Sequence, residues 1–404
     1  MEIRPILSAM SRNKIGALLI ALQIALTLSI VTNAAFIVNQ RSDFVARPTG
    51  LDDANTFIAI TTNFDSNIDA KQLLLDDLDH INAIPGVKAA ITSHSIPVSG
   101  SGNGMTYQLA KDTPSNEAVS FGNFSVDENG LEAFDLDLVA GRNFRPEEIT
   151  WRTLESNDDT KVVLISQALA DALFPDGDAL GKMIWEDESS EAPTEIIGIY
   201  DHMQNAWPDS SNVNLTSLQP FRDLSGPDHY FIVRTEPGER NRIMTQVEEY
   251  LAQNRGRMVH VVRSFEEQKG RTYASDIAMI KLLSGVVVIL TIVTSLGIVG
   301  LAWFSVTQRR KQIGTRRALG ATRFDIMRYF MVENWLITSM GLAIGIVGAL
   351  SLNWFLDTEY QIGRMPLYYL PLGLVLLWVL GQVAVFAPAR RAANIPPALA
   401  TRSV

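Results

Sequence analysis

Residues 15–39 read IGALLIALQIALTLSIVTNAAFIVN, a run of 25 residues without a charge. Three further uncharged windows follow at residues 282–308, 334–356 and 365–389, with lengths of 27, 23 and 25 residues. About 20 apolar residues cross the hydrocarbon core of a bilayer as a helix, so each window is long enough. The sequence therefore predicts four membrane-spanning helices. It excludes a soluble cytosolic enzyme and argues against a membrane β-barrel, whose strands alternate over about ten residues.

Charge is distributed unevenly around these windows. Residues 1–14 carry three basic residues and one acidic residue, residues 307–330 carry seven and one, and residues 390–404 carry three basic residues. Residues 40–280 carry 19 basic and 39 acidic residues. Because basic loops stay on the cytoplasmic side, we expect both termini and the 307–330 loop there. The acidic segment is then outside, and we expect no nucleic-acid partner.

The spans and the charges together predict an order of segments in a multi-pass protein of the bacterial inner membrane, with its large domain in the periplasm. Its expected segments are a cytoplasmic stretch at 1–14, spans at 15–39, 277–306, 332–356 and 365–389, an extracytoplasmic domain with stalk at 40–276, a cytoplasmic loop at 307–331, an outside turn at 357–364 and a cytoplasmic tail at 390–404. The first window could instead be a signal peptide, but signal h-regions run only about 7–15 residues. The chain has no cysteine, so disulfides and zinc thiolate sites are excluded.

The outside segment repeats one pattern of apolar residues. Residues 56–64 alternate like a strand, residues 69–84 have helical spacing, and residues 87–96 again resemble a strand. The same order recurs at 229–235, 239–254 and 258–263, and two such units form a split βαβ layer. The middle, at about 100–227, is expected to be an inserted lobe with strands at 161–165 and 194–200 and a helix at 166–174. The predicted fold class is an α-helical membrane protein with four transmembrane helices plus a large α+β extracytoplasmic domain.

Two helices are expected to leave the membrane as a stalk. Ser264 is a good N-cap with Glu267 three residues later, and no proline interrupts the chain from there to residue 308. A single helix of that length would measure roughly 65 Å, against about 30 Å for the bilayer core. The first helix can likewise continue until Pro48. Short solvated linkers are the alternative, and residues 48–263 are expected to fold alone as a soluble monomer.

Small and polar residues in the spans indicate helix contacts. The small ones follow four-residue spacing and let helix backbones approach closely, within one chain or between two. They are Ala17, Ala21 and Ala25, continued by Ser29, and the pair Gly341 and Gly345. The uncharged polar residues Gln23, Thr27 and Asn33 are expected to form hydrogen bonds between helices.

The loop at 307–330 reads TQRRKQIGTRRALGATRFDIMRYF. Gly314 and Gly320 are positions where a helix can end or turn. Thr322 with Asp325 three residues later predicts a helix start at Arg323. The helix would be short and amphipathic and lie under the membrane. Its apolar face would comprise Ile326, Met327, Phe330 and Met331, with Arg323 and Arg328 off that face. Anchoring to lipid and docking on a partner both explain such a helix.

The chain resembles the MacB-type permeases of ABC transporters, within the FtsX superfamily. The loop matches the family pattern V-T-x-R-x-x-x-I-G-x-x-x-A-L-G-A-x-x-x-D-I from Val306 to Ile326, including Arg309, and Glu333 fits as well. Further resemblances are Ala140-Gly141-Arg142-Asn143-Phe144 outside and the closing stretch from Pro388 to Leu399. The family usually has Glu where this chain has Gln308 and Gln312, which would suit one half of an unequal pair of permeases.

The resemblance implies a mechanism and a set of partners. The permease would act with an ABC ATPase, with a second permease as a homodimer or an unequal heterodimer, with membrane lipid, and with a periplasmic adaptor protein as a further partner. The loop helix would be the coupling helix that docks on the ATPase. The residues we assign to ATPase coupling are Gly314, Gly320, Ala321, Thr322, Arg323, Asp325, Ile326 and Arg328.

No motif predicts catalysis or cofactor binding in this chain. A phosphate loop needs G-x-x-x-x-G-K-[ST], and the nearest run, from Gly177 to Met183, has the wrong spacing. We therefore expect ATP and Mg²⁺ to bind the partner ATPase. The five histidines are scattered without metal-ligand spacing. Export of a peptide, drug or lipoprotein-like substrate is the leading function. Its alternatives are a mechanotransmitter that regulates a cell-envelope enzyme or extracts lipoproteins, and a membrane-anchored sensor.

Overall fold

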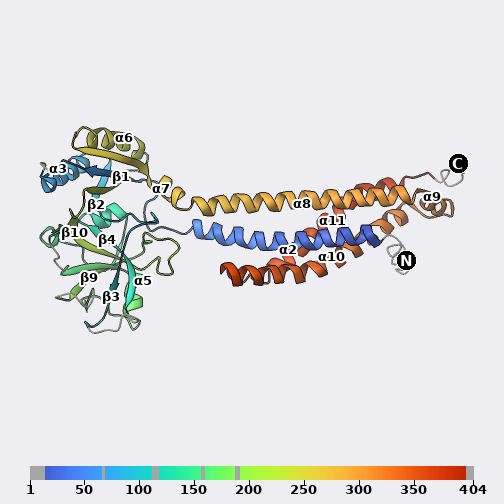
Figure 1. Cartoon of the computed structure of the whole chain (residues 1–404), viewed down its shortest axis with the longest axis horizontal. Helices are drawn as coiled ribbons and strands as arrows, with labels where there is room; N and C mark the ends of the chain where they lie inside the picture. Colours follow the sequence, from blue (N-terminus) through green and yellow to red (C-terminus); the bar gives the residue numbers. More distant parts are fainter. Residues whose placement is uncertain (1–13, 66–68, 112–117, 156–159, 187–191, 397–404) are drawn as a thin grey trace. The chain divides into compact units, whose positions relative to one another are not determined.

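The computed structural model describes residues 14–65, 69–111, 118–155, 160–186 and 192–396. It divides into two compact units (Figure 1). The helical unit comprises Met1–Ala46 and Ser275–Val404, and the α+β unit comprises Arg47–Ala274. The expected segment 1–14, apart from Lys14, lies outside the described residues, as does the end of the tail from residue 397.

The helical unit contains four long helices and one short one among its described residues. They are α2 (Lys14–Val45), α8 (Ala274–Gln308), α9 (Arg310–Ala318), α10 (Arg323–Tyr360) and α11 (Tyr369–Ala393). The four long helices are apolar and long enough to cross a membrane. Together with the α+β unit they confirm the predicted fold class.

Helix α10 differs from the sequence-based expectation. Its start at Arg323 is the predicted one, but the short helix expected there is the beginning of a continuous helix that ends at Tyr360. No glycine or proline lies between Arg323 and Met340, so nothing interrupts the hydrogen-bonded backbone. The separate short helix in this region is α9, which the sequence did not predict.

The stalk also differs from expectation. Ser264 does cap a helix, since its hydroxyl accepts a hydrogen bond from the amide of Glu267 at 3.1 Å. That helix, α7 (Phe265–Thr272), ends at Tyr273, and α8 begins only afterwards. Tyr273 is buried within the α+β unit, where its hydroxyl lies 3.4 Å from Oε1 of Gln204. Within the helical unit, Arg41 and Asp276 form an ion pair of 2.8 Å beyond the uncharged windows of α2 and α8.

Helix α2 packs closely against α10 through small residues. A Cβ atom added at Gly341 would lie 2.7 Å from the carbonyl oxygen of Ala21, and one added at Gly345 would lie 3.0 Å from the Cα atom of Ala25. Both distances are shorter than ordinary van der Waals contact, so the two glycines set the separation of the helices. Ala17 is half-buried beside the core cluster of this unit. The two stripes of small residues thus face each other within one chain.

Polar side chains reinforce the contacts of α2, as the sequence predicted. Asn33 donates to the carbonyl of Ala349 in α10 at 3.0 Å. Thr27 shares a hydrogen bond of 2.7 Å with the hydroxyl of Thr294 in α8, and Gln23 donates to the carbonyl of Val293 at 3.1 Å. These bonds between helices confirm the role assigned to the three residues.

A four-stranded sheet carries the repeated strand–helix–strand pattern. Its strands lie in the order β12-β1-β11-β2, and every neighbouring pair is antiparallel. Each βαβ unit has a strand of the other unit between its own two strands, which is the predicted split βαβ layer. The elements are β1 (Thr56–Asn63), α3 (Ala70–Asn82), β2 (Val87–Ser93), β11 (Asp228–Thr235), α6 (Arg240–Leu251) and β12 (Arg257–Ser264).

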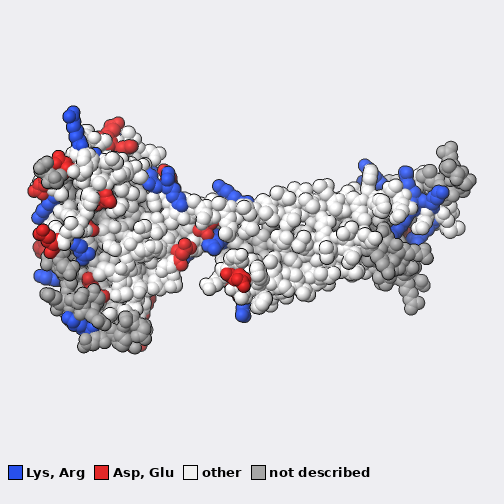
Figure 2. Space-filling model, viewed as in Figure 1, with Lys and Arg blue, Asp and Glu red and all other residues white. Residues whose placement is uncertain are grey.

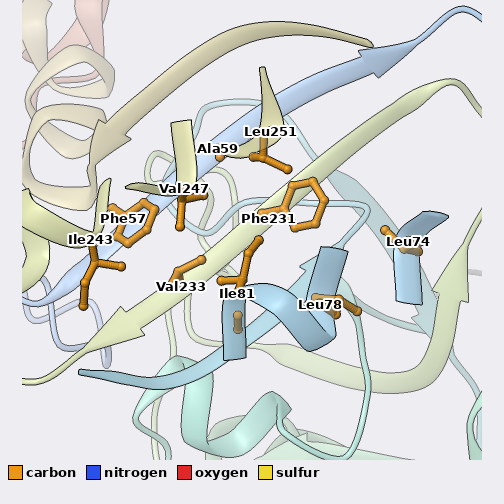
Figure 3. Close-up of a cluster of buried hydrophobic side chains, with 11 residues drawn as sticks. Phe57, Ala59, Leu74, Leu78, Ile81, Phe231, Val233, Ile243, Val247 and Leu251 are labelled. Carbon is orange, nitrogen blue, oxygen red and sulfur yellow. The ribbon is translucent and has the colours of Figure 1, made fainter. Parts of the chain in front are cut away.

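The core of this layer lies between the sheet and its two helices (Figure 3). Phe57, Phe231 and Val233 from the strands meet Ile81 of α3 and Val247 of α6, and all five are fully buried. The alternation of apolar residues along the strands and the helical spacing in between supply these contacts. The core therefore follows directly from the periodicity of the sequence.

The inserted lobe is built on a second, eight-stranded sheet. Its main path runs β3-β4-β10-β7-β9-β5, with β6 paired to β10 and β8 paired to β9. The strands are β3 (Asn103–Tyr107), β4 (Val119–Val126), β5 (Leu138–Gly141), β6 (Thr150–Arg152), β7 (Val162–Ser166), β8 (Met183–Ile184), β9 (Thr194–Tyr200) and β10 (Thr216–Asp223). The helices are α4 (Gly130–Phe134) and α5 (Gln167–Leu173), and a short 3₁₀ turn spans Pro146–Glu148.

The two helix-packing glycines yield a first prediction. Alanine normally favours a helix over glycine by about 1 kcal/mol, yet Gly341→Ala should lower the free energy of unfolding by about 1–3 kcal/mol because the added methyl group overpacks the contact with α2. The matched control is Gly285→Ala in α8, where no described atom lies within 4 Å of an added Cβ. Thermal unfolding in detergent measures both. Equal stability of the two variants would contradict the packing described here.

The limits of the α+β unit yield a second prediction. Phe265 and Tyr273 are 0% and 1% exposed, although both lie beyond the 48–263 segment expected to fold alone. A fragment of residues 47–274 should therefore be more stable than one of residues 48–263, by at least about 3 kcal/mol, since loss of one buried aromatic side chain already has that effect. Urea unfolding followed by circular dichroism measures the difference. Identical midpoints would show that the two aromatic residues add nothing.

Candidate functional site

The most distinctive site of the helical unit is the turn between α9 and α10. Helix α9 ends in a Schellman motif, in which Ala321 N–H donates to the carbonyl of Arg316 at 3.0 Å and Gly320 N–H donates to that of Arg317 at 3.2 Å. Gly320 has a φ of +98°, which side chains rarely permit. The chain therefore turns at Gly320. Gly314, the other predicted turn position, is buried inside α9.

A capping box then starts α10. The hydroxyl of Thr322 accepts a hydrogen bond from the amide of Asp325 at 3.2 Å, and the Asp325 carboxylate accepts one from the amide of Thr322 at 3.0 Å. The same carboxylate accepts a bond of 2.6 Å from the Thr322 hydroxyl. These reciprocal bonds satisfy amides that would otherwise be unpaired at a helix start. The turn between the two helices is thus fixed on both sides.

An apolar cluster holds α9 against the long helices. Ile313 of α9 and Ile326 of α10 are 5% and 3% exposed, and they pack with residues of α11. The buried members of the cluster are Ile313, Ile326, Tyr329, Phe330, Ala389, Ala392, Ala393 and Ile395. Because this contact is made by protein side chains, α9 has a fixed orientation that attraction to lipid alone would not give it.

The outer side of the same turn is exposed. Leu319 is 84% exposed and Phe324 is 62% exposed, and they stand on either side of Gly320. Arg323 and Arg328 are exposed as well, and basic side chains gather at this end of the helical unit (Figure 2). Two large apolar side chains on a rigid turn, surrounded by positive charge, suit contact with another surface rather than with water.

The assigned coupling residues therefore fall into two groups. Gly314 and Ile326 are buried and hold α9 in place, and Ala321 is half-buried. Gly320, Thr322, Arg323, Asp325 and Arg328 are exposed around the turn. The sequence did not single out Leu319 and Phe324 as site residues, because apolar side chains are normally expected to face a core. The only available signal was that Phe324 does not share the apolar face of Ile326.

The structure also places two of the five histidines together in the α+β unit. His94 and His229 line a cavity of about 150 Å³. Burial lowers the pKa of His94 to about 4, so its ring is neutral at physiological pH. Nδ1 of His94 accepts the amide of Ser125 at 3.0 Å, which places the ring proton on Nε2 and leaves no free lone pair for a metal. Among the described residues, no group of three or more His, Cys, Asp or Glu could hold a metal ion.

Comparison with known proteins fits this architecture of four spanning helices and an α+β unit inserted after the first. Residues 17–254 match the family model of the MacB-like periplasmic core domain. Residues 284–397 match that of the FtsX-like permease C-terminal domain. The chain is thus a multi-pass membrane protein of the permease class. It belongs to the family of MacB-like permeases with an FtsX-like C-terminal domain, as the loop motif indicated.

Curated relatives share part of their length with this chain. It is 26% identical over 345 residues to the macrolide export ATP-binding/permease protein MacB of Neisseria gonorrhoeae, covering 81% of this chain and 48% of the relative. It is 24% identical over 313 residues to the protein of the same name from Chromobacterium violaceum, covering 73% and 46%. The chain therefore spans about half the length of the curated relatives it matches.

Solved structures also show similarity to part of the chain. The periplasmic region of MacB from Actinobacillus actinomycetemcomitans is 12% identical, with a TM-score of 0.34, and the match covers 57% of this chain and 97% of that one. The extracellular domain of the ABC-type transporter YknZ from Gram-positive bacteria is 17% identical, with a TM-score of 0.32, covering 51% and 100%.

Proposed function

We propose that this chain is the permease subunit of an ABC transporter, which couples ATP hydrolysis by a separate ATPase to movement of its periplasmic domain. The observation that carries the proposal is the rigid α9–α10 turn, which exposes Leu319 and Phe324 while its inner side is packed into the helical unit. A lipid anchor needs only basic charge and an apolar face. A turn fixed by a Schellman motif and a capping box instead suits docking on a structured partner.

The movement would pass from the turn to the membrane helices. One residue separates the end of α8 from the start of α9, and α10 begins four residues after the exposed Leu319. A displacement of the turn by the ATPase therefore reaches both helices at their ends. Helix α8 has 35 residues and would measure about 52 Å, more than the roughly 30 Å of the bilayer core. Its first residues are joined to α2 by the Arg41–Asp276 ion pair and follow the α+β unit in the chain, so movement of α8 would be conveyed to that unit.

The remaining parts of the proposal follow from the family and from charge. The bacterial inner membrane, with both termini and the turn in the cytoplasm, agrees with the basic residues around the turn. The partners would be an ABC ATPase that binds ATP and Mg²⁺, a second permease and a periplasmic adaptor protein. Export of a peptide, drug or lipoprotein-like substrate agrees with the macrolide export named for relatives of this chain.

The proposal predicts that the chain purified alone hydrolyses no ATP. Turnover should appear only when the partner ATPase is added, and it should disappear when the lysine of the partner's phosphate loop is changed to alanine, because that lysine contacts the transferred phosphate. Phosphate release measures turnover in each mixture. Hydrolysis by the chain alone, in a sample free of contaminating ATPase, would contradict the assignment.

The turn geometry predicts a difference between two substitutions. Gly320→Val should displace the turn, because valine is strained at a φ of +98°, and ATPase binding should fall by about tenfold or more, within the usual range of coupling between sites. Arg328→Gln removes one exposed charge, worth about 1 kcal/mol at a lipid surface, and should weaken ATPase binding less than Gly320→Val does. Co-purification of the ATPase at equal expression measures both. The reverse result would mean that the loop makes a chiefly electrostatic contact.

A further inference from the structure

Arg309 occupies the junction between α8 and α9. Its amide donates to the carbonyl of Ser305 in the last turn of α8 at 3.2 Å, and its carbonyl accepts from the amide of Ile313 in α9 at 2.9 Å. Its guanidinium Nη1 donates to Oε2 of Glu333 in α10 at 2.9 Å and lies 3.3 Å from the hydroxyl of Tyr329. One side chain thus links the end of α8 and the start of α9 to α10.

The ion pair lies among apolar side chains. The side chains of Arg309 and Glu333 are 14% and 10% exposed. They line a cavity of about 40 Å³ whose other lining residues come from α2, α8, α10 and α11. These residues include Ile20 of α2, Ile298 of α8 and Val385 of α11. Separating the two charges would be unfavourable, since each would lose the partner that offsets the cost of its burial. The pair should therefore remain intact when α9 is displaced.

Tyr329 gives α9 a second contact with α10. The guanidinium of Arg316, in the last turn of α9, lies 4.9 Å from the centre of the Tyr329 ring. Tyr329 is therefore held at its hydroxyl by Arg309 and over its ring by Arg316. Both contacts lie on the inner side of α9, whereas Leu319 and Phe324 face outward. A force applied at the exposed turn would reach α10 through these contacts.

We propose that the Arg309–Glu333 pair, with Tyr329, is the positioning element that transmits displacement of α9 to α10. This inference rests on the proposed function, because it names the residues through which docking at the turn moves the membrane helices. Since α10 contacts α2 at Gly341, the same displacement continues to α2. Because both side chains of the pair are largely buried, we expect no direct contact with the ATPase, and loss of the pair should uncouple movement from ATP without releasing the ATPase.

The absence of cysteine in the chain permits a direct test. Spin labels at Asn39→Cys and Ser275→Cys, which are exposed on α2 and at the start of α8, report the distance between the outer parts of these helices. The full chain with its co-purified ATPase is measured with and without ATP. The ATP-dependent distance change should fall by at least about fivefold in Arg309→Gln and in Glu333→Gln, the lower end of typical coupling between sites. ATPase co-purification should stay at the wild-type level.

Three further variants separate transmission from a purely structural role. The charge exchange Arg309→Glu with Glu333→Arg should recover more of the distance change than either single reversal does, because it restores an opposite pair. Tyr329→Phe keeps the ring and removes only the hydroxyl, so it should reduce the ATP-dependent distance change while leaving thermal stability intact. This variant tests the inference even if the charge variants do not fold. The control Arg310→Gln alters the exposed neighbouring residue and should behave as wild type.

Two results would overturn the inference. An unchanged ATP response in Arg309→Gln and Glu333→Gln would show that the pair transmits nothing. The ATP response could instead fall in proportion to thermal stability and fail to recover in the charge exchange. That result would show that the pair only holds the helices together. A wild-type complex that shows no ATP-dependent change would instead overturn the proposed function, and the inference with it, so the two failures are distinguishable.

Discussion

The close approach of α2 and α10 is the constraint on which the helical unit depends. Because Gly341 and Gly345 have no side chain, the backbones of the two helices approach more closely than a Cβ atom at either position would allow. At this separation Asn33 can reach the carbonyl of Ala349. In lipid, where apolar side chains gain little by leaving their surroundings, such contacts and hydrogen bonds are what hold helices together. Helix α10 also carries Glu333 and the capped turn, so its position against α2 decides where the site lies.

The site combines a rigid inner side with an exposed outer side. Ile313 and Tyr329 fix α9 to the bundle, and Gly320 fixes the direction in which Leu319 points. An apolar side chain exposed on such a turn cannot relax into the protein's own core, because the backbone on either side is already hydrogen-bonded. Binding to a partner would then require little ordering of this segment, which favours affinity through preorganisation.

The sequence predicted the elements with strong periodicity and missed those that depend on tertiary contacts. The βαβ strands and helices appeared within a few residues of their observed bounds, because alternation and helical spacing were uninterrupted. Strand β10 was missed since Pro220 interrupts it, and Pro220 falls where its partner changes from β4 to β6. Helix α9 was missed since Gly314 suggested an end, whereas packing of Ile313 outweighs the low helix propensity of glycine. The exposure of Leu319 and the pairing of Arg309 with Glu333 could not be predicted from the sequence, because both depend on contacts between helices.

The hydrogen bond from Asn33 to Ala349 joins residues 316 positions apart, and this separation has a consequence for biosynthesis. At about 5–20 residues per second, α2 is in the membrane for roughly 15–60 s before this part of α10 has been made. During that interval Ser29, Thr32 and Asn33 can still donate within α2, to the carbonyls of Ala25, Leu28 and Ser29. Gln23 and Thr27 find their partners only in α8. Part of the polar surface of the first helix is thus already hydrogen-bonded when the helix is inserted, and its contacts with α10 form only after α10 has been synthesised.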